Sequence, residues 1–220
     1  MPKTNAINNQ SAELTIDPGA SGDSFIQFDI NGTGEFRIGV DDTDSDKFKI
    51  SQGSALGTND TFIMTASGER TMPLQPAFLG YLALQDSNVS GEGTVYTLGS
   101  GNALTEVFDQ GGDFVTTGTF TAPVTGRYYF SMSLQIGGVG AGHYGEMRLV
   151  TSNGTYLLYK NDIVNMGTTV EYTSSAFVDM DASDTATTTL DVAGGAKTID
   201  VAGGTLGGGA PTWFSGYLVA

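Results

Sequence analysis

Short runs of alternating apolar and polar residues occupy the first third of the chain. The first run places Ile26, Phe28 and Ile30 on one side and polar residues between them, which is the period-two pattern of a β-strand. An Asn31-Gly32 pair then predicts a tight hairpin turn. The alternation returns in three later runs, at Phe36, Ile38 and Val40, at Phe48 and Ile50, and at Phe62 and Met64.

Each of these predicted strands supplies only two or three apolar side chains to a core. Isolated hairpins are marginally stable in water, so residues 20–72 need a further apolar surface to cover them. Three copies wrapped around one axis as a β-rich stalk would supply it. A small monomeric β-sandwich layer is the alternative, and both interpretations stay open at this point.

A proline pair separates this region from the rest of the chain. Pro73 and Pro76 each fix one φ angle and remove one backbone donor, as expected of a linker between two architectures. We therefore predict an irregular attachment segment at residues 1–19, a β-rich stalk at 20–72 and a second domain at 73–220.

The second domain contains the longest alternating run in the chain. Its apolar side chains fall at every second position, at Tyr128, Phe130, Met132, Leu134 and Ile136. Asn153-Gly154 separates two further runs and predicts another hairpin. With 32 glycines, many Ser and Thr residues and few helix formers, the composition favours an all-β fold.

The charge balance and the cysteine count exclude several classes of protein. Nine basic against 24 acidic residues give a net charge of −15, which would repel a phosphate backbone, so we expect no binding of nucleic acid. The chain has no cysteine, which excludes disulfides and thiolate metal sites. No run approaches the length of a membrane span, and the first residues lack the pattern of a signal peptide; we expect no membrane insertion.

Two motifs in the second domain resemble the C1q family. The segment Phe120-Thr121-Ala122-Pro123-Val124-Thr125-Gly126-Arg127-Tyr128-Tyr129-Phe130 is similar to the signature of a central strand in that family. The end of the chain, Trp213-Phe214-Ser215-Gly216-Tyr217-Leu218-Val219, resembles its closing strand. The resemblance implies a C1q/TNF-like jelly roll of two antiparallel sheets that forms a homotrimer through aromatic and aliphatic faces, with Tyr128, Phe130 and Phe214 in its core.

The stalk resembles the fibre segments of phage tail and capsid appendages. The similar segments are Asp46-Lys47-Phe48-Lys49-Ile50-Ser51, Gly57-Thr58-Asn59-Asp60-Thr61-Phe62 and Ser67-Gly68-Glu69. An animal C1q relative would be expected to carry a signal peptide and often a collagen-type Gly-X-Y stalk. Their absence favours a virion or extracellular appendage protein whose N-terminus docks to other virion or filament proteins.

Enzymatic activity is not expected. The chain has one histidine, His143, in a glycine-rich loop, and no serine lies in a Gly-x-Ser-x-Gly elbow, so a Ser-His-acid triad has little to build on. We interpret His143 as a loop residue, with an exposed loop tip as its expected place.

The acidic stretch that follows Val40 is the candidate metal site. Asp42, Asp44 and Asp46 alternate as in the first half of an EF-hand loop, but the sixth position is not Gly and Gly53 stands where the bidentate Glu should be. An EF-hand is excluded. A turn that loosely holds a Ca²⁺ ion is the hypothesis, and a solvated acidic turn is the alternative; no other cofactor is expected.

Two glycine-rich loops of the head, residues 137–145 and 203–211, are the candidate contacts with a target, because a rigid sandwich can vary its loops; plain flexible connectors are the alternative. The leading hypothesis is a trimeric viral fibre or spike whose head binds a host-surface glycan or protein as its receptor. The alternative is a purely structural subunit, either a capsid decoration or part of an extracellular filament.

Overall fold

The computed structural model describes residues 14–19, 21–140, 142–162 and 168–220. The predicted attachment segment lies largely outside these residues. Strands dominate the described chain, and the one helical element is a single 3-10 turn, so the prediction of an all-β fold is confirmed. Contacts between residues divide the chain into two units between Leu74 and Gln75, two residues after the predicted start of the second domain.

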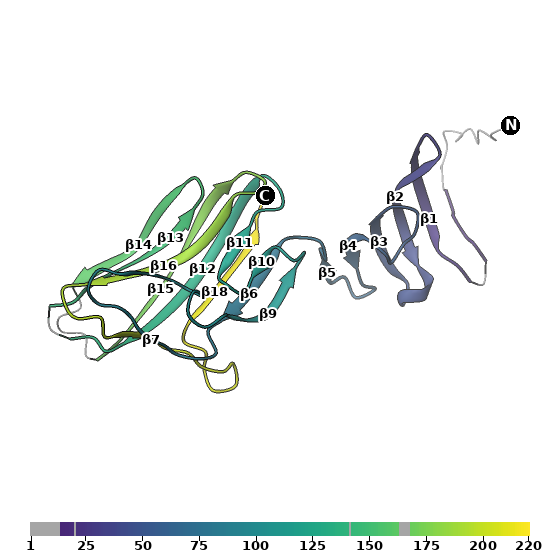
Figure 1. Ribbon diagram of the computed structural model, residues 1–220. Coiled ribbons are helices and arrows are strands. Elements are labelled where there is room, and N and C mark those ends of the chain that lie inside the picture. The colour runs from purple at the N-terminus through teal and green to yellow at the C-terminus, as the bar shows by residue number, and fades with distance from the viewer. Residues whose placement is uncertain (1–13, 20, 141, 163–167) are drawn as a thin grey trace. The chain divides into compact units, whose positions relative to one another are not determined.

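The N-terminal unit is one antiparallel sheet, in which the strands follow each other in chain order. They are β1 (Ser24–Ile30), β2 (Thr33–Asp41), β3 (Lys47–Gln52), β4 (Asp60–Met64) and β5 (Arg70–Thr71) (Figure 1). Asn31 and Gly32 join β1 to β2 with φ angles of 55° and 78°. Positive φ at both central residues is the requirement of a type I′ hairpin turn, so the turn predicted from this pair is present.

The C-terminal unit, which we call the head, contains two antiparallel sheets. One sheet consists of β10 (Phe114–Val115), β11 (Thr119–Thr121), β16 (Thr185–Ala193), β13 (Tyr144–Thr151) and β14 (Gly154–Asp162), with β8 (Val95–Thr97) paired to β16. The other consists of β7 (Asp86–Ser90), β17 (Ile199–Val201), β12 (Gly126–Gly137), β18 (Trp213–Leu218), β6 (Ala77–Tyr81) and β9 (Thr105–Gln110), with β15 (Thr169–Met180) paired to β12.

The two sheets of the head face each other across a single core, as in a jelly roll. The hydroxyl of Thr188 on β16 donates to the sulfur of Met132 on β12 at 3.3 Å, and thereby links one sheet to the other. Phe78 stacks on Phe114 and Phe120, with ring centroids 4.4 and 5.1 Å apart. The predicted core residues Tyr128, Phe130 and Phe214 are fully buried, and this prediction is confirmed.

Both sequence motifs occupy the places that the resemblance implied. The closing strand β18 lies between β12 and β6 within its sheet, with Phe130 opposite Gly216. A Cβ at Gly216 would lie 2.5 Å from the Phe130 ring, so this position requires glycine. The Asn153-Gly154 pair forms the predicted hairpin, in which Thr151 pairs with Gly154.

The N-terminal unit differs from the head in its lack of a core. Among its described residues, Leu56 is the one buried apolar side chain. The apolar residues of its strands are half-buried or exposed, and Phe28 and Ile30 are 56% and 66% exposed.

One prediction about the head is wrong. His143 does not lie at an exposed tip, because its side chain is 4% exposed. Its Nδ1 accepts a hydrogen bond from the Gly140 amide at 2.9 Å. Its ring also packs so closely on Gly195 that a Cβ there would lie 1.9 Å from Nε2. His143 therefore holds its loop closed.

Candidate functional site

The acidic turn between β2 and β3 places its three candidate ligands in different surroundings. Asp44 lies in the 3-10 turn Asp42–Asp44 and binds the ammonium groups of Lys47 at 2.9 Å and Lys49 at 2.7 Å. The Asp42 carboxylate accepts a hydrogen bond from the Gly22 amide at 3.3 Å. Asp46 is exposed, with a left-handed φ of 56°.

In the part of the chain that the structure describes, no group of three or more His, Asp or Glu side chains is arranged to hold a metal ion. Binding of Ca²⁺ at Asp42, Asp44 and Asp46 therefore stays a prediction. The acidic stretch does contribute to a cation-binding arrangement, but the cation is a lysine of the chain itself.

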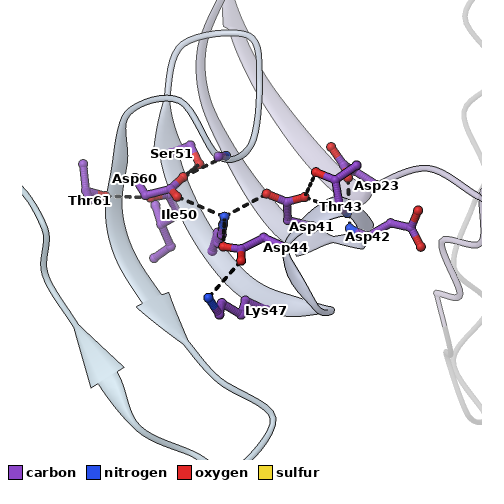
Figure 2. A network of polar contacts seen from close by, with 12 residues as sticks. Asp23, Asp41, Asp42, Thr43, Asp44, Lys47, Ile50, Ser51, Asp60 and Thr61 are labelled. Atoms are coloured by element: carbon purple, nitrogen blue, oxygen red, sulfur yellow. Dashed lines mark hydrogen bonds and ion pairs between the residues drawn. The ribbon is translucent and has the colours of Figure 1, made fainter.

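Lys49 is the centre of a buried polar cluster that sequence reasoning missed. Figure 2 shows the carboxylates of this cluster, Asp41, Asp44 and Asp60. The Lys49 Nζ lies 2.8 Å from Asp41, 2.7 Å from Asp44 and 3.2 Å from Asp60. The side chains of Lys49 and Asp41 are each 3% exposed. The signal was present in the sequence, since Lys49 stands on the polar side of an alternating run, between Phe48 and Ile50.

The carboxylates of this cluster are also hydrogen-bonded by their own loops. Asp41 accepts bonds from the amide and the hydroxyl of Thr43, at 3.0 and 2.7 Å. Asp60 accepts bonds from the Ser51 hydroxyl at 2.5 Å and from the Gly57 amide at 2.9 Å. These hydrogen bonds compensate the buried carboxylates for their lost contact with water. The bond from the Gly57 amide also holds the loop that contains Leu56 over the cluster.

The electrostatics of the cluster favour the charged forms of its members. Hydrogen bonding to Lys49 is the main cause that lowers the pKa of both Asp41 and Asp44. Burial alone would lower the pKa of Lys49, but the hydrogen bonds that its ammonium group donates to Asp41, Asp44 and Asp60 raise it above the ordinary value of 10.5. An amine that is held protonated is neither a nucleophile nor a base, so the cluster is suited to a structural function.

The second notable region is the outward face of the head sheet that contains β12. Tyr129 on β12 lies opposite Phe177 on β15 and Tyr217 on β18. The ring centroid of Tyr129 is 5.0 Å from that of Phe177 and 5.5 Å from that of Tyr217. We call these three residues the aromatic ladder. Phe177 is 64% exposed and Tyr217 is 46% exposed, so the ladder is accessible to another molecule.

A hollow of about 590 Å³ adjoins the ladder on the same face. It lies over β6, β9 and β18, and Leu206 and Ala210 of the 203–211 loop contribute to its wall. Its other apolar lining residues include Leu79, Tyr81, Phe108 and Trp213. Ladder and hollow together form a wide apolar surface on one sheet of the head.

Of the two predicted contact loops, residues 203–211 adjoin this surface, and Leu206 is 56% exposed. The Gly204 amide donates to the Leu82 carbonyl at 2.9 Å and anchors the start of this loop. In the other loop, a Cβ at Gly138 would lie 2.1 Å from the Thr198 carbonyl oxygen. Glycine at that position therefore allows the chain to pass close to its neighbour.

The comparisons with known proteins found similar chains among solved structures. No protein-family model matches the chain, and no curated protein matches it. Among solved structures, the globular domain of zebrafish complement 1qA protein is similar over 66% of this chain and 98% of its own, at 18% identity and a TM-score of 0.43. A structure of murine APRIL at pH 8.5 covers 66% of this chain and 99% of its own, at 9% identity and a TM-score of 0.43.

In the described residues, no helix is long and apolar enough to cross a membrane.

Proposed function

We propose that this protein is a non-enzymatic, homotrimeric appendage, a viral fibre or spike, whose head binds a host-surface glycan or protein. The aromatic ladder is the main observation in support of the trimer. Soluble monomers rarely expose contiguous apolar patches larger than a few hundred Å², yet here the exposed Phe177 and Tyr217 flank Tyr129 next to an apolar hollow.

A second copy of the head is the natural cover for this face. The C1q-type motifs in β12 and β18 favour a three-fold arrangement, in which each face contacts the neighbouring copies around a closed ring. Burial of aromatic side chains contributes strongly to such interfaces. The hollow beside the ladder would receive apolar side chains of a neighbouring copy.

The test is the mass of the assembly in solution. The full chain is expected to form a species of three times 22.9 kDa in native mass spectrometry and light scattering. Tyr217→Glu should dissociate the heads, because it places a charge in the apolar face. Tyr156→Glu is the matched control, since Tyr156 is 38% exposed on β14 in the other sheet. A monomeric wild-type protein would refute the trimer.

Receptor binding is assigned to the loops at residues 137–145 and 203–211. Thr205 in the second loop is exposed and is not among the residues that line the hollow, so a substitution there should leave the trimer contact intact. Thr205→Asp is expected to reduce binding of the labelled full chain to host cells at least tenfold while the trimer persists. Equal binding by wild type and variant would remove this loop from the recognition site.

A structural subunit without a receptor is the second candidate, and the buried Lys49 cluster favours it, because it serves the architecture of the N-terminal unit and not a ligand. Electron microscopy of particles labelled with an antibody to the chain separates the candidates. Sparse labelling at tail or vertex positions supports a fibre, whereas labelling over the whole capsid or along a filament supports a decoration or filament subunit.

A further inference from the structure

The sheet of the N-terminal unit has two faces of different character. On one face, Ile26, Ile38 and Ile50 lie side by side across β1, β2 and β3, and Phe62 extends the row onto β4. Parallel rows on the same face contain Phe28 beside Phe36, and Val40 beside Phe48 and Met64. We call this the apolar face. From β1 to β4 its rows contain no charged side chain.

The opposite face is closed by the chain itself. It carries the Lys49 cluster, covered by the loop that contains Leu56, and the Arg37 guanidinium stacked 3.9 Å above the Phe25 ring centroid. Because polar bonds fill this face, its residues do not need a further partner. The N-terminal unit therefore has one face whose polar groups are bonded within the chain and one apolar face that is left partly exposed.

The apolar face leaves a large area uncovered in a single chain. Ile26, Phe28, Ile30 and Phe36 are between 43% and 66% exposed. Half-exposed side chains of this size each leave on the order of 100 Å² uncovered, so these four leave roughly 400 Å². This is near the largest patch that a monomer exposes, and about half of the area that each partner buries in a stable interface.

We propose that the apolar faces of three copies of this chain pack against each other and form one shared core. The proposal rests on the proposed trimer, and it assigns further copies of the chain as the occupants because that trimer holds three of these faces in one assembly. The net charge of −15 opposes contact between copies elsewhere, whereas the rows of the apolar face contain no charged side chain. The half-buried Ile38, Ile50 and Phe62 would complete the contact.

Two phenylalanines of β1 provide a matched test. Phe28 lies on the apolar face, whereas Phe25, three residues earlier, lies on the opposite face under Arg37. A photoreactive benzoyl-phenylalanine is introduced at position 28 or at position 25 of the full chain, where it keeps the aromatic ring. The wild-type and labelled proteins are prepared as mixtures of ¹⁴N and ¹⁵N chains, unfolded and refolded together, and then irradiated.

The expected result is that the probe at position 28 gives cross-linked peptides of mixed isotope composition, joined to residues 24–64 of another copy. The probe at position 25 should give at least tenfold fewer of these. Three outcomes would overturn the proposal: cross-links from position 28 into residues 75–220, cross-links within one chain only, or a confirmed trimer without cross-links between N-terminal units. A monomeric mass would instead refute the proposed trimer itself.

Discussion

The Lys49 ammonium lies 2.8 Å from the Asp41 carboxylate, and both side chains are 3% exposed. A buried pair of this kind is costly to break, because removal of one partner leaves an uncompensated charge. The Lys49–Asp41 ion pair thus stabilises the packing of the polar face of β2 and β3.

Lys49→Met should destabilise the N-terminal unit by about 3–5 kcal/mol, the usual effect of breaking a buried ion pair. Lys47→Met is the matched control. Lys47 binds Asp44 at 2.9 Å but is 31% exposed, so its loss should cost about 0–1 kcal/mol. Hydrogen exchange of residues 24–64 in the full chain measures both effects. Equal protection in the two variants would contradict the structural importance of the cluster.

The N-terminal unit should lose stability in acid. The pKa values of Asp41 and Asp44 are lowered from 3.8, mainly by hydrogen bonding to Lys49. A lowered pKa in the folded state contributes stability above the unfolded pKa, and this stability disappears as the pH falls through the folded value. The amide protection factors of residues 24–64, corrected for the intrinsic exchange rate at each pH, should therefore fall steeply below about pH 4, and in the Lys49→Met variant this pH dependence should be weaker.

Asp113 in the head should affect stability with the opposite pH dependence. Burial, together with the nearby charge of Asp109, raises its pKa above 3.8, so its ionised form destabilises the fold as the pH rises. Asp113→Asn is expected to raise the melting temperature at pH 7 by about 1–2 °C and to have no effect near pH 2. Asp179→Asn, at a residue that is 89% exposed, should change neither value.

Phe130→Ala should cost about 3–5 kcal/mol, as for other buried phenylalanines. Phe130 is fully buried, and its ring contacts those of Phe120 and Phe214, with centroids 5.6 Å away in each case. For a domain of this size, the melting temperature should fall by roughly 6–20 °C. Val115→Ala is the control, since Val115 is 53% exposed. A melting temperature equal to that of wild type would contradict this account of the core.

The strands of this chain could be predicted because their side chains alternate strictly. Tyr128, Phe130 and Met132 are buried on one side of β12, and the Asn31-Gly32 turn has the positive φ angles that its residues favour. In both cases the residues that determine the local structure are neighbours in the sequence. The same holds for the closing strand around Phe214.

The position of Lys49 in an alternating run is visible in the sequence, but its partners could not be predicted, because the cluster brings together residues from three separate segments. Asp41, Lys49 and Asp60 meet only when β2, β3 and the start of β4 are aligned. The acidic stretch suggested a metal site, since the pattern shows where the carboxylates are but not which cation is near them. His143 was misplaced for a related reason: its partner Gly195 is distant in the sequence and becomes a neighbour only in the folded head.

The location of the buried side chains suggests an order of assembly. The head contains a complete core within one chain, so in the proposed trimer it can fold and associate first, whereas the N-terminal sheet would wait for its neighbours. Once three heads are joined, the few residues around Pro73 and Pro76 tether three sheets together and raise their effective concentration to the millimolar range. An N-terminal sheet that associates too weakly to dimerise at cellular concentrations would then pack spontaneously against the sheets of the neighbouring copies. Its folding would serve as an internal check that the heads have assembled in the correct number.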